Sequence, residues 1–352
     1  MKIAKSVQAL TPYTPGEQPK DRSVIKLNTN ENPYLPSPLV SRVLASFDLD
    51  RLRRYPDPVF MELRRKIAEL NGTVPERVFV GNGSDEVLTL AARAFVDDDE
   101  AIGSCDPSYS LYKTLAAIRN VPFVPSPLGP GFSWRAPVLK GDDGTPVALF
   151  LLTNPNAPTS IRYADADVAA FAKDFAGVCI IDEAYADFAD ANCMALATAP
   201  DNASVIVMRT LSKSFSLAGL RLGYCVGPEL LIEALYKVKD SYNIDALAQE
   251  VALAALSDIP WMKRNTAKVV KTREIVAAEL RRRGWDVPPS QSNFLFAKPA
   301  HRPAAEIFEA LRQRHIFVRY FKGPETGDRL RVTIGTDADM QQLLDALAEL
   351  DR

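Results

Sequence analysis

Histidine is almost absent from this chain, which has only His301 and His315 among its 352 residues. A Ser-His-Asp triad needs a histidine beside its nucleophile, and a histidine-rich metal site needs several. His315 precedes the apolar residues 316–318, so we interpret it as a structural residue at the start of a strand. The sequence therefore argues against triad hydrolysis and predicts no metal site.

Cysteine is also scarce, and its four positions form no C-x-x-C pair. Cys179 and Cys225 lie within strand-like apolar runs, where a buried free thiol is the expected state. The first residues lack the apolar segment of a secretion signal, and no run of about 18 apolar residues is present to span a membrane. We therefore expect a reduced, cytoplasmic protein without a membrane partner.

The chain has no excess of either charge. Its 42 basic and 44 acidic residues are well mixed and give a net charge of -2. Because nucleic-acid-binding proteins carry a basic patch or stripe, no nucleic-acid partner is predicted. The length of 352 residues exceeds what one hydrophobic core usually spans, so two domains are expected.

Short apolar runs alternate with amphipathic segments between residues 75 and 226. Nearly continuous apolar character is typical of strands that are buried on both faces, and a helix is expected from about Asp85. This alternation predicts an α/β domain with a mostly parallel central sheet. The expected strands are residues 78–80, 147–152, 178–181, 205–207 and 222–226.

The two ends of the chain differ from this pattern. The first 36 residues are rich in Pro, Asn and Thr and are expected to form an extended arm. A helical stretch is predicted from Pro228 to Arg283, and Gly284 is a suitable helix stop. Strands at 294–296, 316–318 and 330–334, with helices near 303–314 and at the C-terminus, predict a second, α+β domain. The expected division is an arm over 1–36, a large domain over 37–260 and a small domain over 261–352.

The segment 210–221 places one lysine, Lys213, among small and hydroxylated residues. It lies between two apolar runs that are predicted to be buried strands. A lysine on such a connection, partly desolvated and near Arg221, should have a lowered pKa and be available as an amine nucleophile. An ordinary loop lysine is the alternative, because short motifs of this kind also occur by chance.

Two further residues follow the predicted strand 178–181 closely. Asp182 comes directly after it, where open α/β sheets bind their ligands, and Tyr185 lies three residues later. A buried carboxylate is costly unless it meets a positive partner. A helix cap or a salt bridge would equally explain Asp182.

The turn 81–85, Gly-Asn-Gly-Ser-Asp, follows the strand 78–80 and begins a helix. Glycines permit the tight turn, and the free N–H groups of a helix start suit an anion. Together with Ser212 and Arg221, this turn would make a phosphate site. It is neither a Walker loop nor a full G-x-G-x-x-G, since Glu86 occupies the third glycine position, and a dehydrogenase is therefore disfavoured.

An amine, a strand-end carboxylate and a phosphate site are the parts that pyridoxal phosphate requires. On these residues the chain resembles the fold-type I pyridoxal-phosphate-dependent aminotransferases, and among them the histidinol-phosphate aminotransferases most. The resemblance extends over nearly the whole chain. It rests on residues 10–13 (Leu-Thr-Pro-Tyr), 27–33 (Leu-Asn-Thr-Asn-Glu-Asn-Pro), 54–56 (Arg-Tyr-Pro), 107–109 (Pro-Ser-Tyr), 182–185 (Asp-Glu-Ala-Tyr), 212–213 (Ser-Lys) and 330–335 (Leu-Arg-Val-Thr-Ile-Gly).

The resemblance implies three catalytic residues. Lys213 would form a Schiff base with the cofactor and then carry a proton between Cα and C4′. Asp182 would keep the pyridine nitrogen protonated, and Tyr185 would bond the O3′ oxygen.

The resemblance also implies how the cofactor is held. Tyr109 would stack on its ring. The backbone N–H groups of Ser84 and Asp85, together with Ser212 and Arg221, would bind its phosphate.

Substrate and partner contacts follow from the same resemblance. Tyr55 of a second subunit would complete the phosphate site, which implies a homodimer. Arg319 and Arg331 would bind an anionic group of the substrate, since a guanidinium fork suits both a carboxylate and a phosphate. Arg319 in a plain surface ion pair is the alternative. Tyr13 matches the tyrosine of the family's N-terminal substrate-contacting motif.

One segment departs from the family pattern, which is Pro-Asn-Asn-Pro-Thr-Gly with the second asparagine bonding O3′. Here position 157 is alanine and position 160 is serine. Either Asn156 reaches O3′ from one residue earlier, or Tyr185 supplies this contact alone. The loss of one such hydrogen bond would cost roughly 1–3 kcal/mol.

The resemblance implies an aminotransferase that moves an amino group between histidinol phosphate and 2-oxoglutarate or glutamate, as in histidine biosynthesis. The alternatives are an aromatic amino acid aminotransferase and a lyase like phosphothreonine decarboxylase. A regulator built on an aminotransferase-like domain is disfavoured, because family-like motifs begin by residue 10 and leave no room for a DNA-binding module.

Overall fold

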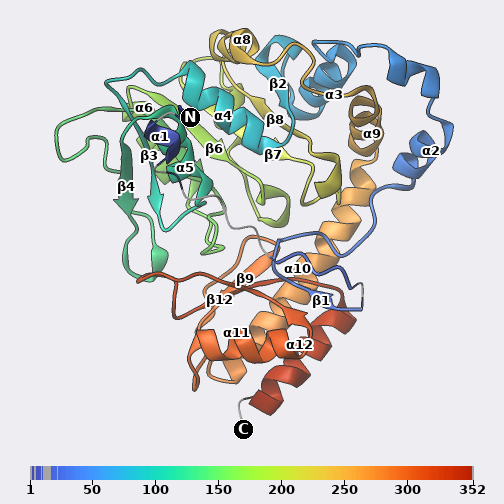
Figure 1. Cartoon of the computed structure of the whole chain (residues 1–352), viewed down its shortest axis with the longest axis vertical. Helices are drawn as coiled ribbons and strands as arrows, with labels where there is room; N and C mark the ends of the chain where they lie inside the picture. The colour runs from blue at the N-terminus through green and yellow to red at the C-terminus, as the bar shows by residue number, and fades with distance from the viewer. Residues whose placement is uncertain (1, 4, 9, 11–16, 22, 351–352) are drawn as a thin grey trace.

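A seven-stranded sheet forms the centre of the computed structural model, which describes residues 2–3, 5–8, 10, 17–21 and 23–350 (Figure 1). Its strand order is β2-β8-β7-β6-β5-β3-β4. The pairs from β7 to β4 are parallel, whereas β8 is antiparallel to both β2 and β7. The predicted mostly parallel sheet is thus confirmed. The strands are β2 (Val78–Gly81), β3 (Ala101–Asp106), β4 (Phe123–Pro127), β5 (Val147–Thr153), β6 (Val178–Asp182), β7 (Val205–Thr210) and β8 (Gly223–Val226).

Both faces of this sheet are buried. In β5, Leu149 and Leu151 belong to the core on one face, and Phe150 and Leu152 belong to the core on the other. This alternation follows from the two-residue period of a strand, and it explains the nearly continuous apolar runs. One face is covered by α4 (Ser84–Ala94), α5 (Leu111–Arg119) and α8 (Glu229–Val238). The other is covered by α2 (Pro38–Ser46), α3 (Met61–Asn71), α6 (Asp165–Asp174), α7 (Met194–Thr198) and α9 (Ala246–Leu256).

The C-terminal part has its own core around a three-stranded antiparallel sheet of order β11-β12-β9. Its elements are α10 (Ile259–Arg282), β9 (Phe294–Ala297), α11 (Ala304–Gln313), β10 (Ile316–Phe317), β11 (Arg319–Tyr320), β12 (Leu330–Thr333) and α12 (Asp337–Leu350). The helix α10 joins the two cores, since Met262 packs in the first and Val276 in the second (Figure 1). We propose that the boundary between the two domains lies in the first turns of α10.

The later part of the predicted N-terminal arm, residues 1–36, packs on the C-terminal core. β1 (Ile25–Lys26) pairs in parallel with β10, and Leu27 is buried in the C-terminal core. The apolar side chains of this short segment are covered by the small sheet and its helices. As a result, residues 28–32 are brought from the C-terminal core to the edge of the large sheet.

Two expectations needed correction. The single helical stretch from Pro228 to Arg283 is divided into α8, α9 and α10 by the segments 239–245 and 257–258. The large sheet also contains β3 and β4, which the apolar runs did not single out because Gly103, Pro125 and Pro127 interrupt them. No described helix has the length and apolar character needed to cross a membrane.

Candidate active site

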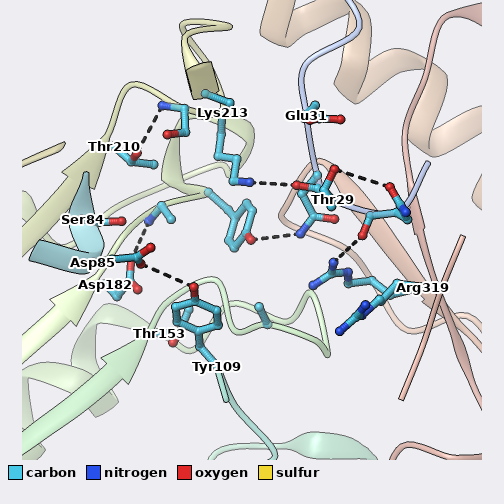
Figure 2. Close-up of a pocket in the computed structure, with 18 of the residues that line it drawn as sticks. Thr29, Glu31, Ser84, Asp85, Tyr109, Thr153, Asp182, Thr210, Lys213 and Arg319 are labelled. Atoms are coloured by element: carbon cyan, nitrogen blue, oxygen red, sulfur yellow. Dashed lines mark hydrogen bonds between the residues drawn. The ribbon is translucent and has the colours of Figure 1, made fainter. Parts of the chain in front are cut away.

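A cavity of about 270 Å³ lies at the carboxyl edge of the large sheet (Figure 2). Thr153, Asp182 and Thr210 line it, and each is the last residue of its strand, in β5, β6 and β7 respectively. Neighbouring parallel strands end at one edge, so their terminal side chains converge there. Arg319 and Arg331 close the cavity from the C-terminal sheet. The site is therefore built by both cores of the molecule.

Lys213 lies on the connection between β7 and β8 and lines this cavity. Its Nζ donates a hydrogen bond of 3.0 Å to the carbonyl oxygen of Thr29 (Figure 2). The same atom lies 5.9 Å from the centre of the Tyr185 ring. Burial, followed by the positive charge of Arg331, lowers the pKa of the Lys213 amine to about 8. The predicted lowered pKa is confirmed. The sequence interpretation named Arg221 as the charged neighbour, but Arg331 has a larger effect on the pKa of Lys213 than Arg221 has.

Asp182 is buried at the end of β6. Its Oδ2 accepts a hydrogen bond of 2.9 Å from the hydroxyl of Tyr112, and its Oδ1 accepts one of 3.1 Å from the N–H of Ala184. Burial raises the pKa of Asp182 to about 6, although these two donors act to lower it. Asp182 has no ion pair among the described residues. The sequence interpretation expected a positive partner for this carboxylate, and no side chain of the described residues supplies one.

Tyr185 is fixed by the N-terminal segment. Its hydroxyl accepts a hydrogen bond of 2.9 Å from Nδ2 of Asn30, and Oδ1 of Asn30 accepts one of 3.0 Å from the hydroxyl of Thr333. The role of Asn30 was not anticipated, although it belongs to a motif used for the family resemblance. A sequence cannot show that residues 30, 185 and 333 meet.

The residues predicted to bind a phosphate lie together at the start of α4. Ser84 and Asp85 occupy the first turn of this helix, where backbone N–H groups have no helical acceptor. Arg221 approaches them, with its Nη2 3.4 Å from Oδ2 of Asp85. Ser212 has a buried Oγ for which the described residues supply no hydrogen-bond partner.

Two glycines keep this part of the cavity open. A Cβ on Gly83, whose φ is +81°, would lie 2.7 Å from Nη2 of Arg221. A Cβ on Gly223 would lie 2.5 Å from the backbone nitrogen of Ser84. Backbone donors, a guanidinium and a hydroxyl that has no partner among the described residues therefore line one part of the cavity. These residues fit the phosphate of pyridoxal phosphate.

The two arginines of the C-terminal sheet face each other. Arg319 in β11 is registered opposite Arg331 in β12, and both guanidinium groups lie over the ring of Phe321, at 5.3 and 5.2 Å from its centre. Like charges directly across a strand pair are destabilising. Arg331 also donates a hydrogen bond of 2.9 Å to the carbonyl oxygen of Asn28. Such a pair beside a cavity suits an anionic ligand, as the sequence interpretation expected.

Tyr109 lines the cavity. Its hydroxyl donates to Oδ1 of Asp85 at 3.4 Å, and its ring meets the ring of Tyr112 edge-on at 5.6 Å. Tyr55 is not part of the site of its own chain, since it is 80% exposed and stacks on Tyr242 at 4.4 Å. Tyr13 lies outside the described residues.

Asn156 does not line the cavity, which contradicts one of the two alternatives for this position. Its Nδ2 donates to the carbonyl oxygen of Pro107 and to the hydroxyl of Thr159, both at 3.0 Å, and its Oδ1 accepts from Ser108 at 2.9 Å. All of its amide atoms are thus used within the fold, and Ala157 faces the cavity instead. Among the residues described, no group of three or more His, Cys, Asp and Glu is placed to hold a metal ion.

Comparison with known proteins agrees with this geometry. Residues 22–347 match the family model "Aminotransferase class I and II".

The chain belongs to the class I and II aminotransferase family.

Among aminotransferases, the chain is 42% identical to a histidinol-phosphate aminotransferase of Geobacter sp. (strain M21), over 99% of this chain and 98% of the relative. It is also 42% identical to histidinol-phosphate aminotransferase 1 of Bradyrhizobium diazoefficiens, over 98% and 97% of the two chains. The structure is similar to that of histidinol-phosphate aminotransferase from Sinorhizobium meliloti in complex with pyridoxal-5′-phosphate. The TM-score of that comparison is 0.88 at 24% identity, covering 100% of this chain and 98% of the other. The predicted fold-type I architecture and aminotransferase activity are thereby confirmed.

Proposed function

We propose that this aminotransferase exchanges an amino group between histidinol phosphate and 2-oxoglutarate or glutamate, with pyridoxal phosphate as cofactor. The main support is the buried amine of Lys213, which shares one cavity with Asp182 and Ser212. The Ser212 hydroxyl has no hydrogen-bond partner among the described residues. Relatives named histidinol-phosphate aminotransferases, about 40% identical over nearly the full chain, support the choice of substrate.

Pyridoxal phosphate, when bound, supplies an aldehyde that condenses with amines and a ring that withdraws electrons from the substrate's amine-bearing carbon. We assign its phosphate to Ser84, Asp85, Ser212 and Arg221. Its ring would lie against Tyr109. The Ala157 side chain, which lines the cavity, has no polar atom, so we assign the ring hydroxyl to Tyr185.

Each catalytic residue has a task that its surroundings favour. The Lys213 amine, with a pKa of about 8, is partly neutral near that pH and can take a proton from the amine-bearing carbon of the substrate. Asp182 is buried without an ion pair among the described residues, so a positively charged ring nitrogen would relieve the cost of its ionisation. Tyr185 is held in place by Asn30.

The opposed arginines define the substrate class. Arg319 and Arg331 together offer two guanidinium forks, so one site can accept a phosphate in one half-reaction and a carboxylate in the other. A dianionic phosphate is the better match for two positive charges. This favours a phosphorylated amino alcohol over an aromatic amino acid.

A homodimer is part of the proposal. Large apolar side chains are unusually exposed within a short segment, and such exposure marks association surfaces. They are Leu35, Leu44, Leu49, Leu52 and Tyr55, each more than half exposed. Tyr55 would reach the phosphate site of the second subunit.

The four cysteines are all free and buried, which agrees with the proposed cytoplasmic location.

The test of the substrate is a panel on the purified protein loaded with pyridoxal phosphate. Histidinol phosphate should abolish the visible absorbance of the bound cofactor, and 2-oxoglutarate should restore it. Phenylalanine should act at least about a hundredfold more slowly in kcat/KM, a difference of about 3 kcal/mol. A faster reaction with phenylalanine would reassign the substrate, and carbon dioxide released from phosphothreonine without an oxo acid would indicate the lyase.

The test of the dimer is complementation between two inactive variants. Lys213→Ala and Tyr55→Ala subunits should each be inactive or weak, but each heterodimer would contain one site with both native residues. Random mixing makes about half of the dimers heterodimers, so about a quarter of the native activity should return. If mixing restores none, Tyr55 does not act across a subunit boundary.

A further inference from the structure

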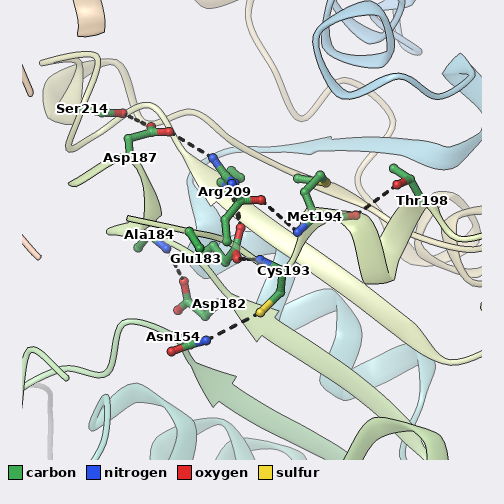
Figure 3. Close-up of polar contacts among 12 residues, drawn as sticks. Asn154, Asp182, Glu183, Ala184, Asp187, Cys193, Met194, Thr198, Arg209 and Ser214 are labelled. Atoms are coloured by element: carbon green, nitrogen blue, oxygen red, sulfur yellow. Dashed lines mark hydrogen bonds and ion pairs between the residues drawn. The ribbon is translucent and has the colours of Figure 1, made fainter. Parts of the chain in front are cut away.

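A chain of largely buried charged groups connects Glu183, through Arg209 and Asp187, with Ser214 (Figure 3). Nε and Nη2 of Arg209 bind Oε2 of Glu183 at 2.8 and 2.7 Å, and its Nη1 binds Oδ1 of Asp187 at 3.0 Å. Oδ2 of Asp187 then accepts a hydrogen bond from the hydroxyl of Ser214. One arginine is thus connected to the neighbours of both catalytic residues, because Glu183 follows Asp182 and Ser214 follows Lys213.

This cluster is expensive to bury. The Glu183 side chain is fully buried, and those of Arg209 and Asp187 are 13% and 22% exposed. Replacing such a cluster by apolar residues is often neutral or stabilising, so a contribution to stability alone explains it poorly. Its value lies in the fixed geometry that a planar guanidinium imposes on two carboxylates.

The backbone of the lysine loop is held from two sides. Nδ2 of Asn32 donates to the carbonyl oxygens of Lys213 and Ser214, at 3.1 and 3.2 Å. Asp187 holds the Ser214 side chain from another element, the short helix 186–188. Arg209 in turn fixes Asp187, and it does so without lining the cavity that contains the Lys213 amine.

We propose that Arg209 is a positioning residue, which fixes the place of the Lys213 amine in the cavity by holding Asp187 against Ser214. This inference rests on the assignment of Lys213 as the reacting amine. Arg209 touches neither cofactor nor substrate in this arrangement. A misplacement of the order of 1 Å in a catalytic group costs on the order of a hundredfold in rate, so a relaxed loop should have a measurable effect.

The first measurement uses the protein without cofactor. Lys213 is labelled with an amine reagent at a series of pH values, and mass spectrometry gives the midpoint of its reactivity. The native midpoint should be about 8. In Arg209→Ala the amine should gain solvent, and the midpoint should rise by about one unit toward the 10.4 of an ordinary lysine. In the loaded enzyme kcat should fall on the order of a hundredfold.

Arg77→Ala is the matched control. Arg77 is also a partly buried arginine of the large domain, but its hydrogen bonds to the described residues all go to backbone carbonyls, among them those of Ala197 and Gly227. Its loss should lower the melting temperature and leave the Lys213 midpoint unchanged. If Arg209→Ala behaves in the same way, with kcat within about twofold of Arg77→Ala, Arg209 is only structural and the proposal fails.

Chemical rescue separates position from stability. A second cavity of about 510 Å³ is lined by Arg209 and Asp187 and not by Lys213, so a free guanidinium ion has access to the space left in Arg209→Ala. Guanidinium at millimolar concentration should restore the midpoint and part of kcat, and should not affect Arg77→Ala. If guanidinium restores neither the midpoint nor kcat at concentrations that leave the native enzyme intact, the proposal is contradicted.

Two milder variants cover the case in which Arg209→Ala does not fold. Asp187→Asn keeps the shape of the side chain but loses the charge that binds Arg209, and Ser214→Ala removes only the last link. Both should shift the Lys213 midpoint in the same direction, Asp187→Asn by more. No shift in either variant would overturn the proposal. Because amine labelling needs no cofactor or substrate, this outcome is independent of whether histidinol phosphate is the substrate.

Discussion

The hydroxyl of Tyr112 lies 2.9 Å from Oδ2 of Asp182 and donates a hydrogen bond to it, with both side chains buried. Thr153 shares the same hydroxyl, at 2.6 Å. Burial raises the pKa of Asp182, whereas the donated hydrogen bond lowers it. Tyr112 therefore helps to keep Asp182 ionised at neutral pH, which is the state that a protonated ring nitrogen requires.

We expect Tyr112→Phe to move the acid limb of the kcat–pH profile to higher pH. Without its donor, Asp182 binds a proton more readily and loses its charge earlier as the pH falls. The affinity for pyridoxal phosphate should fall about tenfold, the equivalent of one hydrogen bond. Tyr163→Phe is the control, because the buried Tyr163 hydroxyl has no partner among the described residues. An unchanged acid limb in Tyr112→Phe would show that Asp182 does not depend on it.

Asp182 should also leave a signature in the stability of the cofactor-free protein. Burial raises the pKa of Asp182 from 3.8 to about 6, so the folded state binds this proton more tightly than the unfolded chain. Stability contributed at this position is therefore lost as the pH rises from about 4 to about 6. The free energy of unfolding of Asp182→Asn, measured in urea and compared with that of the native protein, should rise by on the order of 3 kcal/mol between pH 4 and pH 7. A difference that is constant over this range would contradict the raised pKa.

Gly83→Ala should weaken cofactor binding through a steric effect. The new Cβ would lie 2.7 Å from Nη2 of Arg221 and displace that guanidinium from the phosphate site. We expect the dissociation constant of pyridoxal phosphate, measured by absorbance titration, to rise at least about tenfold, since charged hydrogen bonds contribute about 1.5–3 kcal/mol. Gly144→Ala has similar backbone strain, with φ of +87°, but its Cβ would meet nothing within 4 Å. Equal affinities in the two variants would mean that Arg221 does not bind the phosphate.

The two substrate arginines should be distinguishable by their effect on Lys213. Arg331→Gln and Arg319→Gln should each raise KM for histidinol phosphate about tenfold to a hundredfold, through loss of a charge-assisted bond. Arg331 is one of the charges that lower the pKa of Lys213, so Arg331→Gln should also raise the pH midpoint of Lys213 labelling. Arg319→Gln should raise it less. An equal shift in both would show that the two guanidinium groups act on the amine alike.

Lys213 and Asp182 were predictable because their chemistry depends on local context. Each adjoins an apolar run that is long enough to be recognised as a buried strand, and strand ends in α/β sheets converge on one edge. Tyr112 was missed because nothing near it in sequence distinguishes it from a core aromatic of α5; its partner is 70 residues away. Asn156 was one of two alternatives, and its amide is bound to Pro107, Thr159 and Ser108 instead of lining the cavity, which the sequence does not reveal.

The sequence by itself determined the α/β class and predicted the lysine, the carboxylate and the helix start that line the cavity, because period-2 burial and residue type act over a few neighbouring positions. Only the tertiary structure decided which distant groups complete them: Thr29 and Asn30 from the N-terminal segment, Tyr112 from a helix, and Arg319 opposite Arg331 from the second sheet. The burial of charged groups and their resulting pKa values were likewise decided by the tertiary structure, since they depend on everything that surrounds a charge. The link from Glu183 through Arg209 and Asp187 to Ser214 was also decided by the tertiary structure. It joins a strand to two loops that meet only when the sheet is formed.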